Sequence, residues 1–160
     1  GTAAERATAF LEDFANKAGL TVGEAQQLQA TLGAVAQGIG FTQEASADLS
    51  IELTKIAADV ASFSNISAGA EPVLQAFRSA LVGEREALKT YGIAITEAEV
   101  QTKAFEQTGK NSADALTRQE KALATSALIF ERFTMIKSFV GLGYKSTDAK
   151  TLSLIELSVS

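Results

Sequence analysis

The sequence predicts an all-α protein, a compact bundle of about six or seven helices with one short extended segment near residues 93–95. Only one of the 160 residues is proline, and since proline costs roughly 3 kcal/mol inside a helix, little interrupts long helices here. Hydrophobic residues form 46% of the chain but aromatic residues only 7%, and many small apolar side chains suit closely packed helices. The pattern Thr-x-x-Glu, a capping box typical of helix starts, also recurs. Its copies are Thr2-x-x-Glu5, Thr21-x-x-Glu24, Thr96-x-x-Glu99 and Thr117-x-x-Glu120.

The first two expected helices follow two of these capping boxes. The first covers residues 2–18, where apolar side chains recur on one helical face, and Gly19 provides its C-terminal stop. The second covers residues 21–39, where leucine, valine and isoleucine recur in steps of four and three until Gly38 and Gly40 break the pattern. Each helix is therefore expected to bury one face.

The clearest apolar stripe of the sequence lies in the helix expected over residues 42–63. Its members, in alternating steps of four and three, are Leu49, Leu53, Ile56, Val60 and Phe63. Such a stripe packs either into the core of its own chain or along a second chain. Several short stripes separated by glycines favour a compact bundle over one continuous rod. A polar break follows at residues 64–67.

The next expected helix covers residues 72–83, and a shorter one covers residues 84–91. Pro72 suits the first turn of the longer helix, and Gly83 closes it. Gly92 then supplies a left-handed turn, after which the chain runs extended and its isoleucines pack inward. The hypothesis for this segment is a structural joint made of Gly83, Glu84, Glu86, Leu88, Tyr91 and Gly92.

The last two expected helices cover residues 96–109 and 117–140, and each follows a capping box. The polar residues 110–112 form a loop between them. Residues 141–160 are an uncertain tail, for which a frayed helix and an added strand are equally arguable. Residues 1–140 are therefore expected to form one helical domain.

Composition excludes several classes of function. The formal net charge is −5 and no stripe of Lys and Arg appears, so no specific nucleic-acid partner is expected. Because the chain lacks Cys and His, it cannot build disulfides, thiolate zinc sites or the Ser-His and Cys-His arrangements of hydrolases. No apolar run approaches the roughly 18 to 20 residues needed to cross a bilayer. We expect neither a cofactor nor a metal.

Carboxylates are the remaining candidates for catalysis. A general acid and base could come from Glu84, Glu86, Glu97 or Glu99, but helix caps and solvated faces account for such residues more simply. The Gly-Ile-Gly at residues 38–40 lacks the later glycine and the Lys-Ser/Thr ending of a phosphate loop. We therefore expect that the chain is not an enzyme.

Three segments, in order along the chain, resemble the conserved part of tailed-phage (prophage) tail tape-measure proteins. Residues 57–65, Ala-Ala-Asp-Val-Ala-Ser-Phe-Ser-Asn, resemble a small-residue helix ending in an Ala-Ser-Phe-x-Asn turn. Residues 79–93 are similar to the family's more specific motif, in which Ala-Leu-x-Gly-Glu leads to Leu-Lys-x-Phe/Tyr-Gly-Ile. Residues 116–122 resemble its Leu-Thr-x-x-Glu-Lys helix opening. The resemblance covers roughly residues 28–132, with Ala87 where the family often has proline.

The resemblance implies a structural protein of the virion tail, present in the host cytoplasm during assembly. Such a protein sets tail length by its own length, fills the tail-tube lumen and is ejected ahead of the DNA. Its implied partners are other tail proteins (tube, chaperone and tail tip) and further copies of itself, and it would contact a membrane only at ejection. A generic helical protein–protein interaction module remains the alternative.

Overall fold

The computed structural model describes residues 21–63 and 69–139, and side chains up to Ile136. Of the first twenty residues it describes five, all helical: Glu5, Ala9, Leu11, Glu12 and Ala15. Otherwise the helix expected over residues 2–18, the polar break at 64–67 and the tail at 141–160 lie outside the described residues. Helices and short turns make up the described ranges, which contain no strand. The predicted all-α fold class is therefore confirmed.

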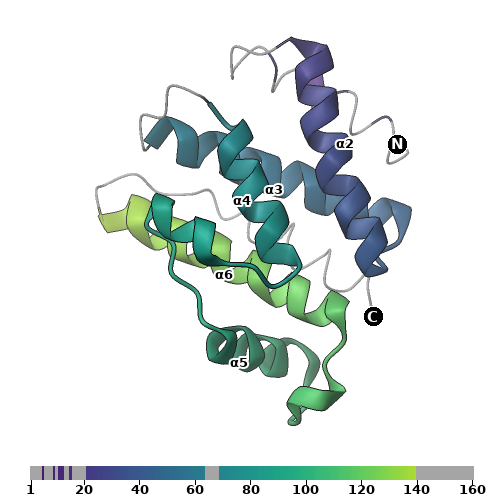
Figure 1. The fold of residues 1–160 in the computed structure, drawn as a ribbon, viewed down its shortest axis with the longest axis vertical. Coiled ribbons are helices and arrows are strands. Elements are labelled where there is room, and N and C mark those ends of the chain that lie inside the picture. Colours follow the sequence, from purple (N-terminus) through teal and green to yellow (C-terminus); the bar gives the residue numbers. More distant parts are fainter. Residues whose placement is uncertain are drawn as a thin grey trace.

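Two central helices organise the described bundle (Figure 1). The elements in order are α2 (Val22–Ile39), α3 (Gln43–Phe63), α4 (Glu71–Leu81), the 3-10 helix η1 (Glu86–Tyr91), α5 (Glu97–Thr108), the 3-10 helix η2 (Ala113–Ala115) and α6 (Arg118–Phe139). α3 contacts α2, α4 and α6, while α4 contacts α2, α3, η1 and α6. α5 packs on α6, so α2 and α5 lie at opposite ends of the bundle in Figure 1.

The start and the end of α2 follow from its sequence. Thr21 Oγ1 accepts a hydrogen bond from the backbone N–H of Glu24 at 3.1 Å, and the Glu24 carboxylate accepts one from the Thr21 N–H at 3.4 Å. These two bonds complete the predicted capping box. The helix is capped by Gly40, whose φ of +118° glycine adopts readily and other residues adopt only with strain.

α3 carries the main part of the core. The first four members of its predicted stripe, Leu49, Leu53, Ile56 and Val60, are all buried. Phe63, the fifth, is 36% exposed, although its ring packs edge-on against buried Phe133 of α6 with centroids 5.7 Å apart. Helix α3 is thus buried along most of its length but reaches the surface at its C-terminal end.

Polar side chains are also buried on α3. Ser46, Ser50 and Thr54 follow one another at intervals of four residues, so they form a row along one face of the helix. Ser50 Oγ donates to the Ser46 carbonyl oxygen and Thr54 Oγ1 to the Ser50 carbonyl oxygen, each at 2.6 Å. The Ser50 and Thr54 hydroxyls are therefore satisfied within their own helix, whereas Ser46 Oγ is buried without a partner among the described residues.

α6 begins with a complete capping box and is the longest described helix. Thr117 Oγ1 accepts from the Glu120 N–H at 3.1 Å, and Glu120 accepts from the Thr117 N–H at 2.8 Å. Burial opposes ionisation of Glu120, but hydrogen bonds from Lys110 and Thr117 outweigh it and lower the pKa of this carboxyl.

In the part of the chain that the structure describes, no helix is both long and apolar enough to cross a membrane.

Candidate functional site

The predicted joint lies between α4 and α5. Two left-handed glycines bound it, Gly83 with φ +100° and Gly92 with φ +77°. The backbone N–H of Gly83 bonds the Ala80 carbonyl oxygen at 3.0 Å, and that of Gly92 bonds the Lys89 carbonyl oxygen at 3.0 Å. Both glycines therefore close helical turns in a conformation that other residues adopt only with strain, as predicted for Gly92.

Between these glycines the sequence predicted a short helix over residues 84–91 without fixing its type. The structure has a 3-10 helix over Glu86–Tyr91, so the helix starts two residues later than predicted. The turn that closes α4 runs on to Glu84, whose N–H bonds the Ser79 carbonyl oxygen at 2.9 Å, so a new helix cannot start there. At six residues, the segment is longer than most 3-10 helices.

The side chains of the joint divide into buried and exposed groups. Leu88 is completely buried and Tyr91 is half-buried against the core. Ile93 and Ile95, which follow the joint, are buried as predicted but belong to no strand. Glu84 and Glu86 are exposed, and Glu86 pairs with Lys89 at 3.1 Å on the surface. Apolar contacts therefore attach the joint to the core, and its two glutamates take no part in that attachment.

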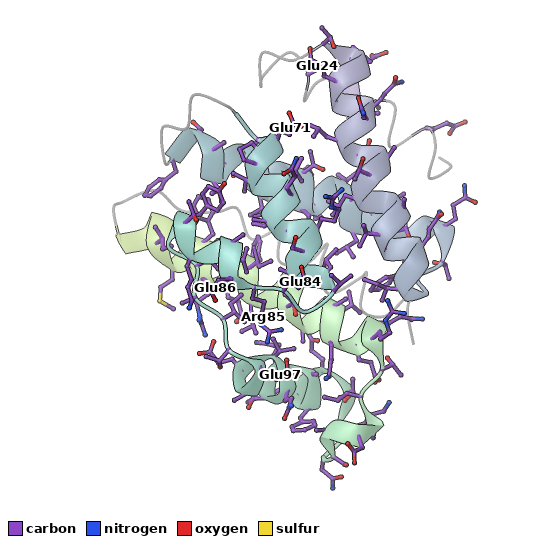
Figure 2. The ribbon with its side chains drawn as sticks, in the orientation of Figure 1. Glu24, Glu71, Glu84, Arg85, Glu86 and Glu97 are labelled. Atoms are coloured by element: carbon purple, nitrogen blue, oxygen red, sulfur yellow. The ribbon has the colours of Figure 1, made fainter. Side chains whose placement is uncertain are left out.

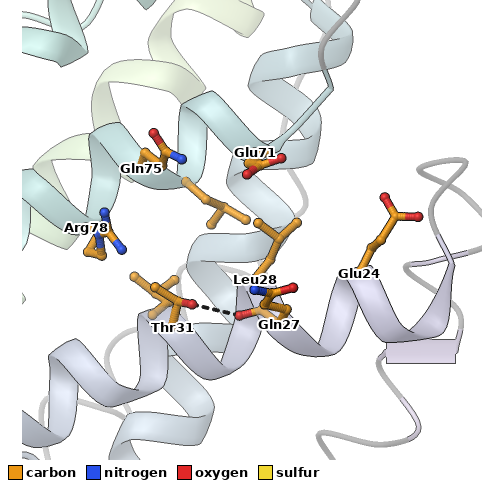
Figure 3. A pocket seen from close by; sticks show the side chains of 9 residues that line it. Glu24, Gln27, Leu28, Thr31, Glu71, Gln75 and Arg78 are labelled. Carbon is orange, nitrogen blue, oxygen red and sulfur yellow. Dashed lines mark hydrogen bonds between the residues drawn. The ribbon is translucent and has the colours of Figure 1, made fainter.

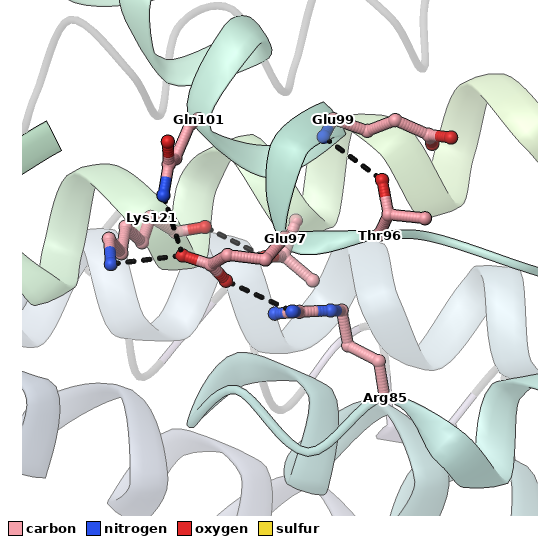
Figure 4. A network of polar contacts seen from close by, with 7 residues as sticks. Arg85, Thr96, Glu97, Glu99, Gln101 and Lys121 are labelled. Atoms are coloured by element: carbon pink, nitrogen blue, oxygen red, sulfur yellow. Dashed lines mark hydrogen bonds and ion pairs between the residues drawn. The ribbon is translucent and has the colours of Figure 1, made fainter.

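Arg85, a residue that the sequence did not single out, connects the joint to α5. Its Nη2 donates to Glu97 Oε2 at 3.0 Å (Figure 4). The other oxygen of Glu97 accepts from Lys121 Nζ at 3.1 Å and from Gln101 Nε2 at 3.3 Å. Figure 2 shows Arg85 on the side of the joint that faces Glu97. One carboxylate thus binds cations from two segments that are distant in sequence.

The environment of Glu97 stabilises its charged form. Partial burial opposes ionisation, but hydrogen bonds from Lys121, Gln101 and Arg85 outweigh it and hold the pKa of this carboxyl below its ordinary value. Glu97 keeps 47% of its side chain exposed, so solvent weakens each ion pair. We call this cluster of Glu97, Arg85, Gln101 and Lys121 a polar clamp, because the Glu97 carboxylate accepts hydrogen bonds from the other three side chains.

A second clamp involves Glu99, for which the sequence predicted a capping box. Thr96 Oγ1 does accept from the Glu99 N–H at 3.2 Å. The Glu99 carboxylate, however, pairs with Arg132 Nη2 of α6 and does not accept from the Thr96 backbone N–H, so the capping box is incomplete. Arg132 Nη1 also donates to the Ala94 carbonyl oxygen at 2.6 Å. A cation from α6 attracts this carboxylate because α5 and α6 pack side by side.

A third cross-helix pair strengthens the contact between α5 and α6. Lys103 Nζ lies 2.7 Å from Glu131 Oε1 and 3.5 Å from Glu106 Oε2. The hydrogen bond to Glu131 raises the pKa of Lys103 despite partial burial of the ammonium group. Three independent charged contacts therefore fix α5 on α6, at Glu97, Glu99 and Lys103.

The four glutamates considered for catalysis do not converge on one substrate position. Glu97 and Glu99 each pair with cations, while Glu84 and Glu86 are exposed on the joint. Among the described residues, no group of three or more acidic, Cys or His side chains is placed to hold a metal ion. The geometry of this region is suited to holding helices together.

Two hollows open on the described surface. One, of about 360 Å³, lies between α2 and α4 and has Leu28 between acidic Glu24 and Glu71 at one end and Arg78 at the other (Figure 3). The second, of about 300 Å³, lies between α5 and α6, and its cations Lys103 and Arg132 already bind carboxylates.

Sequence reasoning found the backbone of the joint but missed the clamps. The glycines were visible as helix ends, whereas Arg85, Lys121 and Arg132 are surface cations with no local signature. No family model matches the chain, and no curated protein or solved structure matches it either. The motifs and the geometry of the joint therefore carry the argument about function.

Proposed function

We propose that this chain is a segment of a tailed-phage tape-measure protein and has a structural role in tail assembly. The observation that carries the proposal is the meeting of two tape-measure-like motifs at one carboxylate. Arg85 comes from the motif at residues 79–93 and Lys121 from the motif at residues 116–122, and both bind Glu97. Two of the three motifs thus supply the cations of the clamp, and Glu97, which they bind, lies between them in the sequence.

The individual motif positions also have local physical roles. Gly83 and Gly92 adopt left-handed conformations, and Leu88 is completely buried. Thr117 and Glu120 form the capping box that starts α6. In the motif at residues 57–65, Val60 is buried. A motif whose positions are occupied by caps, turns and core contacts supports a shaped structural segment over a reaction centre.

Helix geometry supplies a physical basis for a ruler. A helix rises about 1.5 Å per residue, so a fully helical rod of this chain would be on the order of 240 Å long. The described helices instead fold back on one another. In the proposed role, the segment is a local folded part of a longer ruler, and flanking helical stretches supply most of the measured distance.

The proposal is tested on a phage whose long tail gene encodes this segment. Mass spectrometry of purified tails should detect its peptides, such as those from Ala122–Arg132, and they should disappear from tails that have ejected their DNA. Peptides of the tube protein, which stays in place, provide the control. Detection only in the soluble host fraction, or a short cellular gene as the parent, would refute the proposal in favour of a cellular interaction module.

A further inference from the structure

The two ends of the bundle differ in how they are attached to its centre. At one end, ion pairs join α5 to α6 through Glu97, Glu99 and Lys103. At the other end, α2 has Glu24 as its only charged residue, and the Glu24 carboxylate is engaged in the capping box of its own helix. Charged contacts therefore cannot hold the body of α2 on its neighbours.

The interface between α2 and α3 is also short of polar bonds. A Cβ placed on Gly33 of α2 would lie 3.3 Å from Ser50 Oγ, so the two helices approach closely there. Ser50 and Thr54, in the hydroxyl row of α3, bond back to their own helix. They do not cross to α2, so separating the helices breaks neither of these bonds.

Two buried polar atoms at this end of the bundle favour separation. Within the described part of the chain, Gln29 Nε2 and Ser46 Oγ are buried without a hydrogen-bond partner. Gln29 lies one turn before Gly33 on the same face of α2, and Ser46 lies one turn before Ser50. An unsatisfied buried group costs roughly 1–3 kcal/mol, and water removes that cost when the helix leaves.

Apolar contacts hold α2, but they are modest. Its buried apolar residues are Ala25, Leu32, Ala36 and Ile39, and Leu28 and Val35 also pack against the core but stay partly exposed. On its other side, the hollow of about 360 Å³ separates parts of α2 from α4. The contact of α2 with the centre therefore consists of apolar side chains, two of which stay partly exposed, beside an open hollow.

The C-terminal end of α2 is anchored more firmly. Gln119 Nε2 of α6 donates to the Gly40 carbonyl oxygen at 2.8 Å, and Phe41 is buried. Three residues, 40–42, separate α2 from α3, and Gly40 has the left-handed conformation. This combination makes a pivot at Gly40 that stays in place while the helix before it moves.

We propose that α2 is a releasable arm, which separates from α3 by turning at Gly40 while α3 to α6 stay folded. Because a single helix of 18 residues is only marginally stable in water, the released arm unwinds transiently and its amides exchange. Release exposes the hydroxyl row of α3, which water can solvate. The arm is a property of this fold and holds whatever the parent protein is.

Hydrogen exchange of the 160-residue chain tests the first part of this proposal. Since local openings range in free energy up to that of global unfolding, amides in the middle of α2 should exchange on the order of 100-fold faster than those in the middle of α6. Equal protection of α2 and α6 would overturn the proposal.

A disulfide between Gly33→Cys and Ser50→Cys tests whether release from α3 is the motion. The chain has no other cysteine, and the 3.3 Å approach at this position suits a cross-link. Oxidation should slow exchange in α2 by at least about tenfold relative to the reduced form of the same variant. The two single-cysteine variants should show no effect of oxidant. Unchanged exchange after cross-linking would mean that α2 frays in place, and would refute release.

A second variant keeps the test decisive if the cysteine pair disturbs folding. Gln29→Leu removes the unpaired amide and should slow exchange in α2 severalfold, because an apolar side chain suits the buried position. Gln26→Leu is the matched control on the exposed face of α2 and should leave exchange unchanged. Faster exchange in Gln29→Leu would contradict the role given to the unpaired amide.

Discussion

Gln119 and Gly40 are 79 residues apart in sequence, yet Gln119 Nε2 donates to the Gly40 carbonyl oxygen at 2.8 Å. The same amide nitrogen lies only 2.4 Å from the place where a Cβ on Gly40 would be. The φ of +118° favours glycine here, and the Gln119 amide, at the end of a flexible side chain, would have to shift to admit a Cβ. This bond joins the first turn of α6 to the residue that ends α2.

Gly40→Ala should destabilise the protein by about 1–3 kcal/mol, because alanine is strained at this φ and displaces the Gln119 amide. Gly38→Ala is the control. Gly38 lies inside α2 with nothing within 4 Å of its Cβ position, so alanine there should stabilise by about 0.5–1 kcal/mol. Urea unfolding measures both, and equal effects of the same sign would contradict the proposed constraint at position 40.

Glu97→Gln should lower stability at pH 7 by less than about 1 kcal/mol, since its ion pairs are half-exposed. The folded-state pKa of Glu97 is lowered, so its contribution is present above the unfolded-state pKa and is lost as pH falls through the folded-state pKa. Urea unfolding at a series of pH values should show that the difference in unfolding free energy between Glu97→Gln and wild type becomes smaller below about pH 4.3. Glu84→Gln is the control at pH 7, and because this side chain is exposed it should change the free energy of unfolding by less than about 0.5 kcal/mol.

Gly92→Val should destabilise the protein by about 2–3 kcal/mol, because a β-branched residue is poorly tolerated at a φ of +77°. Gly92→Asn should cost less, because Asn adopts the left-handed conformation more readily than other side chains. Thermal unfolding followed by circular dichroism separates the two variants. Unchanged helicity and melting in Gly92→Val would show that the joint does not require this glycine.

Phe133→Ala should cost about 3–5 kcal/mol, since this ring is 1% exposed and its removal leaves a cavity. Phe63→Ala removes the partner of the same edge-on pair but empties a site that is 36% exposed. Its cost should be nearer 1 kcal/mol, about that of an aromatic pair. Chemical denaturation of both variants measures the difference, and a larger loss in Phe63→Ala would contradict the burial seen here.

Local signals allowed the helices to be predicted from the sequence. Capping boxes at Thr21 and Thr117 and left-handed glycines at positions 40 and 92 depend on interactions within a few residues. The predicted helix over residues 96–109 agrees with α5 for the same reason. The type of η1 was not predicted, because apolar spacing over six residues does not separate 3-10 from α geometry.

Contacts between distant segments could not be predicted in the same way. The Glu99 carboxylate could bond its local cap or a cation from another helix, and the packing of α5 on α6 brings Arg132 close enough for the second. The ion pairs of Arg85 and Lys121 with Glu97 could not be predicted either, because the residues next to them in the sequence do not indicate which carboxylate they bind. Only the three-dimensional arrangement shows which surface charges work together.

The tight geometry of η1 limits which length changes the chain can accept. A 3-10 helix has about three residues per turn, so one residue inserted between Glu86 and Tyr91 would rotate everything after it by roughly a third of a turn. Glu97 would then face away from Arg85, and α5 would lose its alignment. Insertions in natural variants of this sequence should therefore avoid η1 and collect in the polar loop at residues 110–112, where neither helix has its register altered.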